Sequence, residues 1–106
     1  MHAHLLAAGY YIGSSDGDRA AVLELLEYVH PKGGNVDMET ANTGIAHLAM
    51  YVDDIWADYK RLLARGVTFR SEPVLVEEGV NVGVRTVYLR DPDNVTLELV
   101  ERPGVV

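Results

Sequence analysis

The sequence of 106 residues contains no cysteine. This absence excludes disulfide bonds, thiolate zinc sites and cysteine nucleophiles, and it is typical of a reducing compartment, so we expect a cytoplasmic protein. No apolar run approaches the ~20 residues that a helix needs to cross a bilayer. Met1 is followed by neither a basic segment nor a long apolar one, so secretion is not indicated.

Basic residues are also scarce, with nine lysines and arginines against sixteen acidic residues and a net charge of −7 when histidine is neutral. Nucleic-acid binding depends on clustered basic side chains that neutralise phosphates. The densest basic group here is Lys60, Arg61 and Arg65 on one expected helix. We therefore discount nucleic acid and membranes as partners and expect a small molecule or a protein.

Length and composition indicate one folded domain. Hydrophobic residues make up 48% and charged residues 24% of the chain, which is ordinary for a globular protein and excludes a disordered one. Domains commonly have ~100–200 residues, so the chain forms one domain or part of one. A chain of this size buries only about 60–68% of its unfolded surface, which leaves a modest core.

The first part of the chain predicts two strands and a connector. Residues 5–13 are apolar, and turn-forming residues at 14–18 separate them from a second apolar run at 20–29. Leucine and glutamate in the second run also favour a helix, but the preceding turn and the following Pro31 favour a strand. The polar segment 35–43 is the expected linker.

The second part of the chain predicts the order β-α-β-β-β. One face of the strand at 45–52 is wholly apolar and should pack against a helix, and the other face carries His47. The helix follows directly, with Asp53 or Asp54 as its N-cap and Gly66 at its C-terminal end. Its apolar stripe consists of Ile55, Trp56, Tyr59, Leu62 and Leu63. The remaining strands are expected at 67–70, 74–76, 84–90 and 95–101.

Two segments of the chain resemble each other, which indicates an internal repeat. Residues 21–27 and 95–101 carry Leu, Glu, Leu and Glu at the same four positions, and each copy follows a Tyr-aliphatic pair and a turn. Counted from the second copy, the first lacks its opening strand and its helix. We therefore interpret residues 1–34 as the two-strand remnant of one βαβββ module and residues 44–103 as a complete module, together forming one domain.

A series of short motifs runs in order through the complete module. They are Gly44-Ile45-Ala46-His47-Leu48, Val52-Asp53-Asp54-Ile55, Arg65-Gly66-Val67, Pro73, Tyr88-Leu89-Arg90-Asp91-Pro92-Asp93-Asn94 and Thr96-Leu97-Glu98-Leu99. In this order they resemble the vicinal oxygen chelate superfamily, which includes glyoxalase I, bleomycin-resistance proteins, methylmalonyl-CoA epimerases and extradiol dioxygenases. The resemblance implies an α+β fold in which glyoxalase-like βαβββ modules form a cupped mixed sheet around a divalent metal. One departure is the turn at Asp93-Asn94, where the family usually has glycine.

Carried over residue by residue, the resemblance assigns metal ligation to His47 and Glu98 of the complete module and to Glu24 of the incomplete one. Glu98 or Glu24 would also act as general base. One imidazole and two carboxylates suit Mn, Fe, Co, Ni or Zn. The alternation of strand side chains independently places His47 and Glu98 on the face opposite the apolar one. His4 stays open as a fourth ligand.

Three further residues, Tyr51, Arg85 and Tyr88, are predicted to bind substrate, with Arg85 holding an anionic group. For each candidate a plainer role stays open: a structural histidine, a solvated glutamate on an open sheet face, or a solvated arginine.

The expected function is metal-dependent lyase, isomerase or dioxygenase activity on a small oxygen-rich substrate. The alternatives are a metal-free protein that binds a drug-like molecule and confers resistance, or a non-catalytic remnant. An incomplete module leaves an exposed strand edge, so we expect a homodimer that completes the cup.

Overall fold

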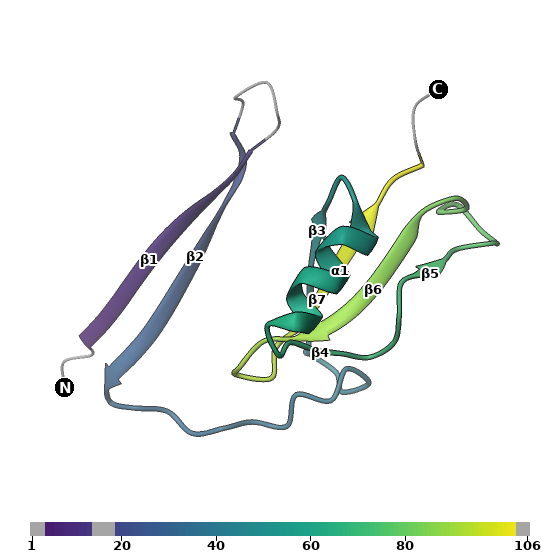
Figure 1. The fold of residues 1–106 in the computed structure, drawn as a ribbon. Helices are drawn as coiled ribbons and strands as arrows, with labels where there is room; N and C mark the ends of the chain where they lie inside the picture. The colour runs from purple at the N-terminus through teal and green to yellow at the C-terminus, as the bar shows by residue number, and fades with distance from the viewer. Residues whose placement is uncertain (1–3, 14–18, 104–106) are drawn as a thin grey trace. The chain divides into compact units, whose positions relative to one another are not determined.

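The computed structural model describes the backbone of residues 4–13 and 19–103, and the side chains of residues 25, 26 and 28–103. The chain divides into two compact units, a hairpin unit (Met1–Val36) and a sheet unit (Asp37–Val106), both drawn in Figure 1. Each unit has its own pattern of strand pairing.

The hairpin unit consists of two long antiparallel strands, β1 (His4–Gly13) and β2 (Arg19–His30). Both predicted strands are therefore present, each within about one residue of its expected bounds. Pairing with β1, rather than the helix-forming residues in the second run, decides the conformation of β2, because each strand supplies the other's backbone hydrogen bonds. The turn predicted at residues 14–18 lies outside the described residues. Leu25 and Val29 of β2 are 51% and 57% exposed.

The sheet unit has the predicted order of elements and forms a mixed sheet. In chain order they are β3 (Leu48–Tyr51), α1 (Ile55–Ala64), β4 (Thr68–Phe69), β5 (Val74–Leu75), β6 (Arg85–Arg90) and β7 (Thr96–Glu101). The strand order is β3-β7-β6-β4, and β5 also pairs with β6. The first and last strands, β3 and β7, are parallel neighbours, whereas all other pairs are antiparallel. The expectation of an α+β fold with a mixed sheet is confirmed.

Strand β3 is shorter than the predicted run at 45–52. Its first residue, Leu48, pairs with Leu97 on β7, and β7 itself begins only one residue earlier. Residues 45 and 46 therefore lie beyond the end of the neighbouring strand and have no ladder partner there. His47 stands immediately before the strand.

Helix α1 is fixed at both ends by the residues that the sequence indicated. The Asp54 carboxylate accepts a hydrogen bond from the Ala57 N–H at 3.1 Å and so caps the first turn. The last strand adds a second carboxylate, because Glu101 Oε2 accepts from the Ile55 N–H at 2.8 Å. After α1, Gly66 adopts a φ of 89°, the left-handed conformation that ends many helices.

The core lies between α1 and one face of the sheet. Ile55 is fully buried against Val87, Leu89 and Leu99 of the two central strands. Figure 1 shows α1 lying across this face of the sheet. The buried stripe is narrower than predicted, since Trp56 and Leu63 remain 39% and 49% exposed. No helix in the described part of the chain is long and apolar enough to cross a membrane.

The turn between β6 and β7 explains the departure from the family pattern. The Asp91 carboxylate accepts hydrogen bonds from the N–H groups of Asp93 and Val95, at 2.9 and 2.7 Å. Asn94 then adopts a φ of 71°. Asparagine is one of the few residues besides glycine that tolerate this conformation, so it replaces the usual glycine without breaking the turn.

Candidate functional site

The parallel pairing of β3 and β7 brings His47 and Glu98 together. Ala49 pairs with Glu98, and His47 lies two residues before Ala49, so His47 and Glu98 share the sheet face that α1 does not cover. His47 Nε2 is 3.1 Å from Glu98 Oε1. The His47 side chain is 42% exposed and that of Glu98 only 16%. The result is a partly sheltered imidazole–carboxylate pair.

Strand β6 contributes two more polar groups to this pair. Thr86 Oγ1 donates a hydrogen bond to Glu98 Oε2, the oxygen that does not contact His47. Tyr88 is the register partner of Glu98, and its ring packs edge-on against the His47 ring with centroids 5.6 Å apart. Both oxygens of the carboxylate therefore have defined partners. Thr86 was missed by the sequence reasoning, although its spacing of two from Tyr88 places it on the same face.

The environment of the site changes the pKa of Tyr88. Burial raises the pKa of its hydroxyl above the usual 10.0, and the Glu98 charge and a hydrogen bond to that carboxylate add to the rise. The positive charge of Arg70 lowers the pKa of Tyr88 and so offsets part of the rise. Tyr88 is therefore held as a neutral hydroxyl beside the carboxylate.

The His47–Glu98 geometry is compatible with two ligands of one divalent ion. Two donors that each lie ~2.1 Å from an ion at a right angle are about 3 Å apart, close to the observed separation. Nitrogen and carboxylate oxygen are also donors that Mn, Fe(II), Co, Ni and Zn accept. Among the described side chains, no group of three or more metal-binding residues converges on one point.

The predicted third ligand, Glu24, lies on β2, where its backbone pairs with Gly9. Its side chain, like that of His4, lies outside the described residues. The sheet unit by itself thus contains two of the three residues that are predicted to be ligands.

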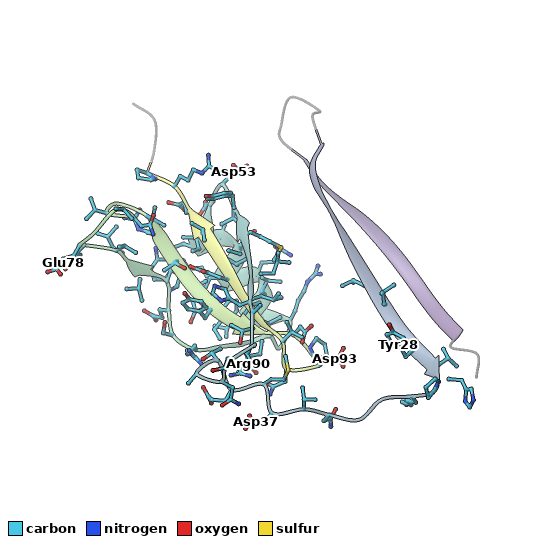
Figure 2. The ribbon with its side chains drawn as sticks, turned by 180° about the vertical axis from the view of Figure 1, so that it is seen from behind. Tyr28, Asp37, Asp53, Glu78, Arg90 and Asp93 are labelled. Carbon is cyan, nitrogen blue, oxygen red and sulfur yellow. The ribbon has the colours of Figure 1, made fainter. Side chains whose placement is uncertain are left out.

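A cavity of about 590 Å³ opens beside Glu98 on the same face. Its wall includes five valines and comes from the end of the sheet and from the loop between β5 and β6. The valines are Val76, Val80, Val82, Val84 and Val100. Figure 2 shows the side chains of this loop, with Glu78 labelled at its outer edge. An apolar cavity next to the carboxylate can hold the body of a small molecule.

Tyr51, one of the predicted substrate-binding residues, lines this cavity and is 67% exposed. The guanidinium of Arg102 stacks over the Tyr51 ring in a cation–π contact, 3.7 Å from the ring centroid. Arg102 was not singled out by the sequence reasoning, although it follows Glu98 at a spacing of four and so falls on the same side of the extended chain.

Arg85 lies on the other side of β6 from Thr86 and Tyr88. Arg85 pairs with Glu101 at 3.5 Å, and Glu101 caps α1 on the opposite side of the sheet. Since Thr86 and Tyr88 face the site, the alternation along β6 directs Arg85 to the helix side. The predicted role of Arg85 in holding an anionic substrate group stays a prediction, and this position gives it no support.

Comparison with known proteins agrees with this architecture. Residues 4–99 match the family model of the Glyoxalase/Bleomycin resistance protein/Dioxygenase superfamily. The chain belongs to this superfamily.

Among the relatives is a 2-epi-5-epi-valiolone epimerase from an Actinomyces species, 34% identical over 77% of this chain and 45% of that protein. A lactoylglutathione lyase from Haemophilus influenzae is 31% identical over 86% of this chain and 62% of the relative. The chain thus spans 45–62% of the length of these curated relatives. A glyoxalase family protein from Bacillus cereus shares the fold, with a TM-score of 0.68 and 21% identity over 92% of this chain and 63% of that one.

Proposed function

We propose that this chain is a metal-dependent lyase or isomerase of the glyoxalase superfamily that acts on a small, oxygen-rich substrate. The observation that carries the proposal is the 3.1 Å approach of His47 Nε2 to Glu98 Oε1 on the face left open by α1. The names of the two curated relatives, an epimerase and a lyase, support this chemistry over oxygenation.

His47 and Glu98 would hold the ion, and the third predicted ligand, Glu24, belongs to the hairpin unit. A divalent ion at this place would supply Lewis-acid stabilisation of negative charge that develops on substrate oxygens. Thr86 orients the Glu98 carboxylate, because its hydrogen bond fixes one Glu98 oxygen and leaves the other directed at His47. Such supporting contacts orient ligands and tune their basicity.

Glu98 would also act as the general base. It takes a proton from the substrate carbon next to the vicinal oxygens and returns it to the same or a neighbouring atom, so no proton is gained or lost overall. The Tyr88 hydroxyl, kept neutral by its raised pKa, remains a hydrogen-bond donor beside this carboxylate. The valine wall beside Glu98 shelters the reacting atoms from water.

We further propose that a homodimer in the cytoplasm is the working form. Within the hairpin unit, Leu25 and Val29 expose about half of their surface, and apolar side chains of this kind gain free energy when a partner covers them. A second copy of the chain is the partner that would also close the open edge of β3. The absence of cysteine supports the cytoplasmic location.

Elemental analysis of protein purified without an affinity tag tests the metal site. After incubation with Mn(II), Ni(II), Zn(II) or Fe(II) and removal of free ions, we expect about one ion per chain for at least one metal. His47→Ala and Glu98→Gln should each lower the content to below ~0.1 per chain, because each removes one of few ligands.

His30→Ala and Glu72→Gln are matched controls, since both residues are exposed and neither lies in the His47–Glu98 pair. They should bind metal as the unchanged protein does. Metal uptake that survives Glu98→Gln, with the fold intact by circular dichroism, would contradict the ligand assignment.

A metal-free binding protein is the second candidate, favoured by the valine-lined cavity of about 590 Å³. The same experiment separates the two functions. A protein that takes up none of the four metals yet binds apolar small molecules would be a sequestering protein rather than an enzyme of this type.

A further inference from the structure

One cation borders the valine-lined cavity, and its position relative to Glu98 is set by the last strand. Glu98, Val100 and Arg102 follow one another at a spacing of two residues, and all three line the cavity. An extended chain rises about 3.3 Å per residue, so the Cα atoms of Glu98 and Arg102 are about 13 Å apart. The cavity thus has a carboxylate at one end and a guanidinium at the other.

Arg102 is held at its end of the cavity by an aromatic ring. Its guanidinium lies 3.7 Å from the centroid of Tyr51 on β3, the strand beside β7. This cation–π contact orients the flat guanidinium but uses none of its N–H groups, which stay available to a ligand. Among the described side chains no carboxylate forms an ion pair with Arg102.

The wall between the two charges is largely apolar, although Asn81 and Thr86 also line it. Val76, Val82 and Val84 come from the loop that precedes β6, and Val100 lies between Glu98 and Arg102 on β7. The volume of about 590 Å³ falls within the ~300–1,000 Å³ that small-molecule sites usually offer. Such a cavity accepts an apolar body of moderate length whose far end carries the opposite charge to arginine.

We propose that Arg102 is a specificity residue that selects ligands with a carboxylate at the end of an apolar chain. The carboxylate accepts two N–H bonds from the guanidinium, the apolar chain lies along the valine wall, and the other end of the ligand reaches Glu98. That this other end is the reacting one rests on the proposed function. The anion preference itself does not depend on a metal.

Binding of octanoate and of octanamide to metal-free protein tests this proposal, because the two probes share one apolar chain and differ only in the head group, a carboxylate in one and a neutral amide in the other. Isothermal titration calorimetry should show octanoate binding about tenfold more tightly, as expected for a charge-assisted pair. Arg102→Gln should remove this tenfold preference and leave octanamide binding unchanged. Arg102→Lys keeps the charge and should keep part of the preference.

Arg61→Gln is the matched control, because Arg61 stands on α1 and pairs with Asp58 there. It should leave both affinities unchanged. Equal binding of octanoate and octanamide to the unchanged protein, no binding of octanoate, or a preference that persists in Arg102→Gln would each overturn the proposal. Since the probes are titrated without metal, a failure of metal uptake by His47 and Glu98 leaves this outcome intact and refutes only the proposed enzymatic function.

Discussion

The Tyr88 hydroxyl lies against the Glu98 carboxylate, so its ionisation would place two negative charges side by side. Its pKa is raised in the folded chain, mainly by burial and then by Glu98. Below the usual pKa of 10.0 both folded and unfolded chains keep the proton, whereas above it the unfolded chain releases the proton first. The free energy of unfolding should therefore fall as the pH rises through this range, and Tyr88→Phe should reduce the fall. Urea unfolding between about pH 8 and pH 11 measures the effect.

Tyr59→Phe is the control, because Tyr59 stands on α1 and packs on Phe69 rather than beside Glu98. Its pH profile should match that of the unchanged protein. If the free energy of unfolding of Tyr88→Phe falls with pH as much as that of the unchanged protein, Tyr88 is not the cause of the pH dependence.

Thr86 offers a second test at the scale of one side chain. Thr86→Val keeps the shape and the strand preference but removes the hydroxyl that donates to Glu98 Oε2. A supporting contact of this kind is commonly worth 10- to 100-fold in metal affinity, so we expect a drop of about that size with the fold intact. Titration calorimetry with Mn(II) or Ni(II) measures it. Thr68→Val, on β4, should bind metal normally, and an unchanged affinity in Thr86→Val would remove Thr86 from the site.

The orientation of a side chain could be predicted from the sequence where it depends only on the two-residue alternation of a strand. Alternation along the strand at 45–52 is sufficient to place His47 on the face opposite the apolar side chains. Alternation also predicts the side of β7 on which Glu98 lies. The role of Thr86 depends on which residue of β6 lies beside Glu98, and that register is set by the geometry of the turn that joins β6 to β7. Arg85 and Tyr88 have opposite parity on one strand, so the prediction that both face the substrate could hold for only one of them.

Helix α1 stabilises the sheet unit through very few fully buried side chains. Ile55 is fully buried against Val87, Leu89 and Leu99. Ile55→Ala should therefore lower the free energy of unfolding by about 2–5 kcal/mol, and the milder Ile55→Val by about 0.5–1.5 kcal/mol, because each leaves a cavity. Urea denaturation measures both variants.

Leu63→Ala on the same helix is the comparison, since Leu63 is 49% exposed. Its loss should stay below about 1 kcal/mol. Equal losses at the two positions would mean that Leu63 packs in the folded protein as tightly as Ile55 does.

The ends of helices and strands could be predicted where they depend on residues close together in the sequence. The capping aspartate and the glycine at φ 89° each act over a few residues, and each appears as expected. The length of β3 was not predictable, because it depends on where the neighbouring strand β7 begins. The narrower stripe of α1 has the same origin, since the sheet covers only part of the helix surface.

At the scale of the whole molecule, the proposed homodimer makes a direct prediction. Size-exclusion chromatography with light scattering at micromolar concentration should give a mass of about twice 11.7 kDa. Leu25→Lys together with Val29→Lys, on the exposed part of β2, should shift the protein toward one chain, because charged side chains oppose burial. Glu72→Lys is the control at an exposed site outside the strands. A mass of one chain for the unchanged protein would contradict the dimer.

The parallel pairing of β3 with β7 has a consequence for how the site comes into existence. His47 and Glu98 are separated by 51 positions and meet only through this pairing of the module's first and last strands. During synthesis the imidazole leaves the ribosome long before its carboxylate partner, and no earlier strand can substitute for β7. Because β7 lies between β3 and β6 in the sheet, the His47–Glu98 pair can form only after the last strand of the module has been made.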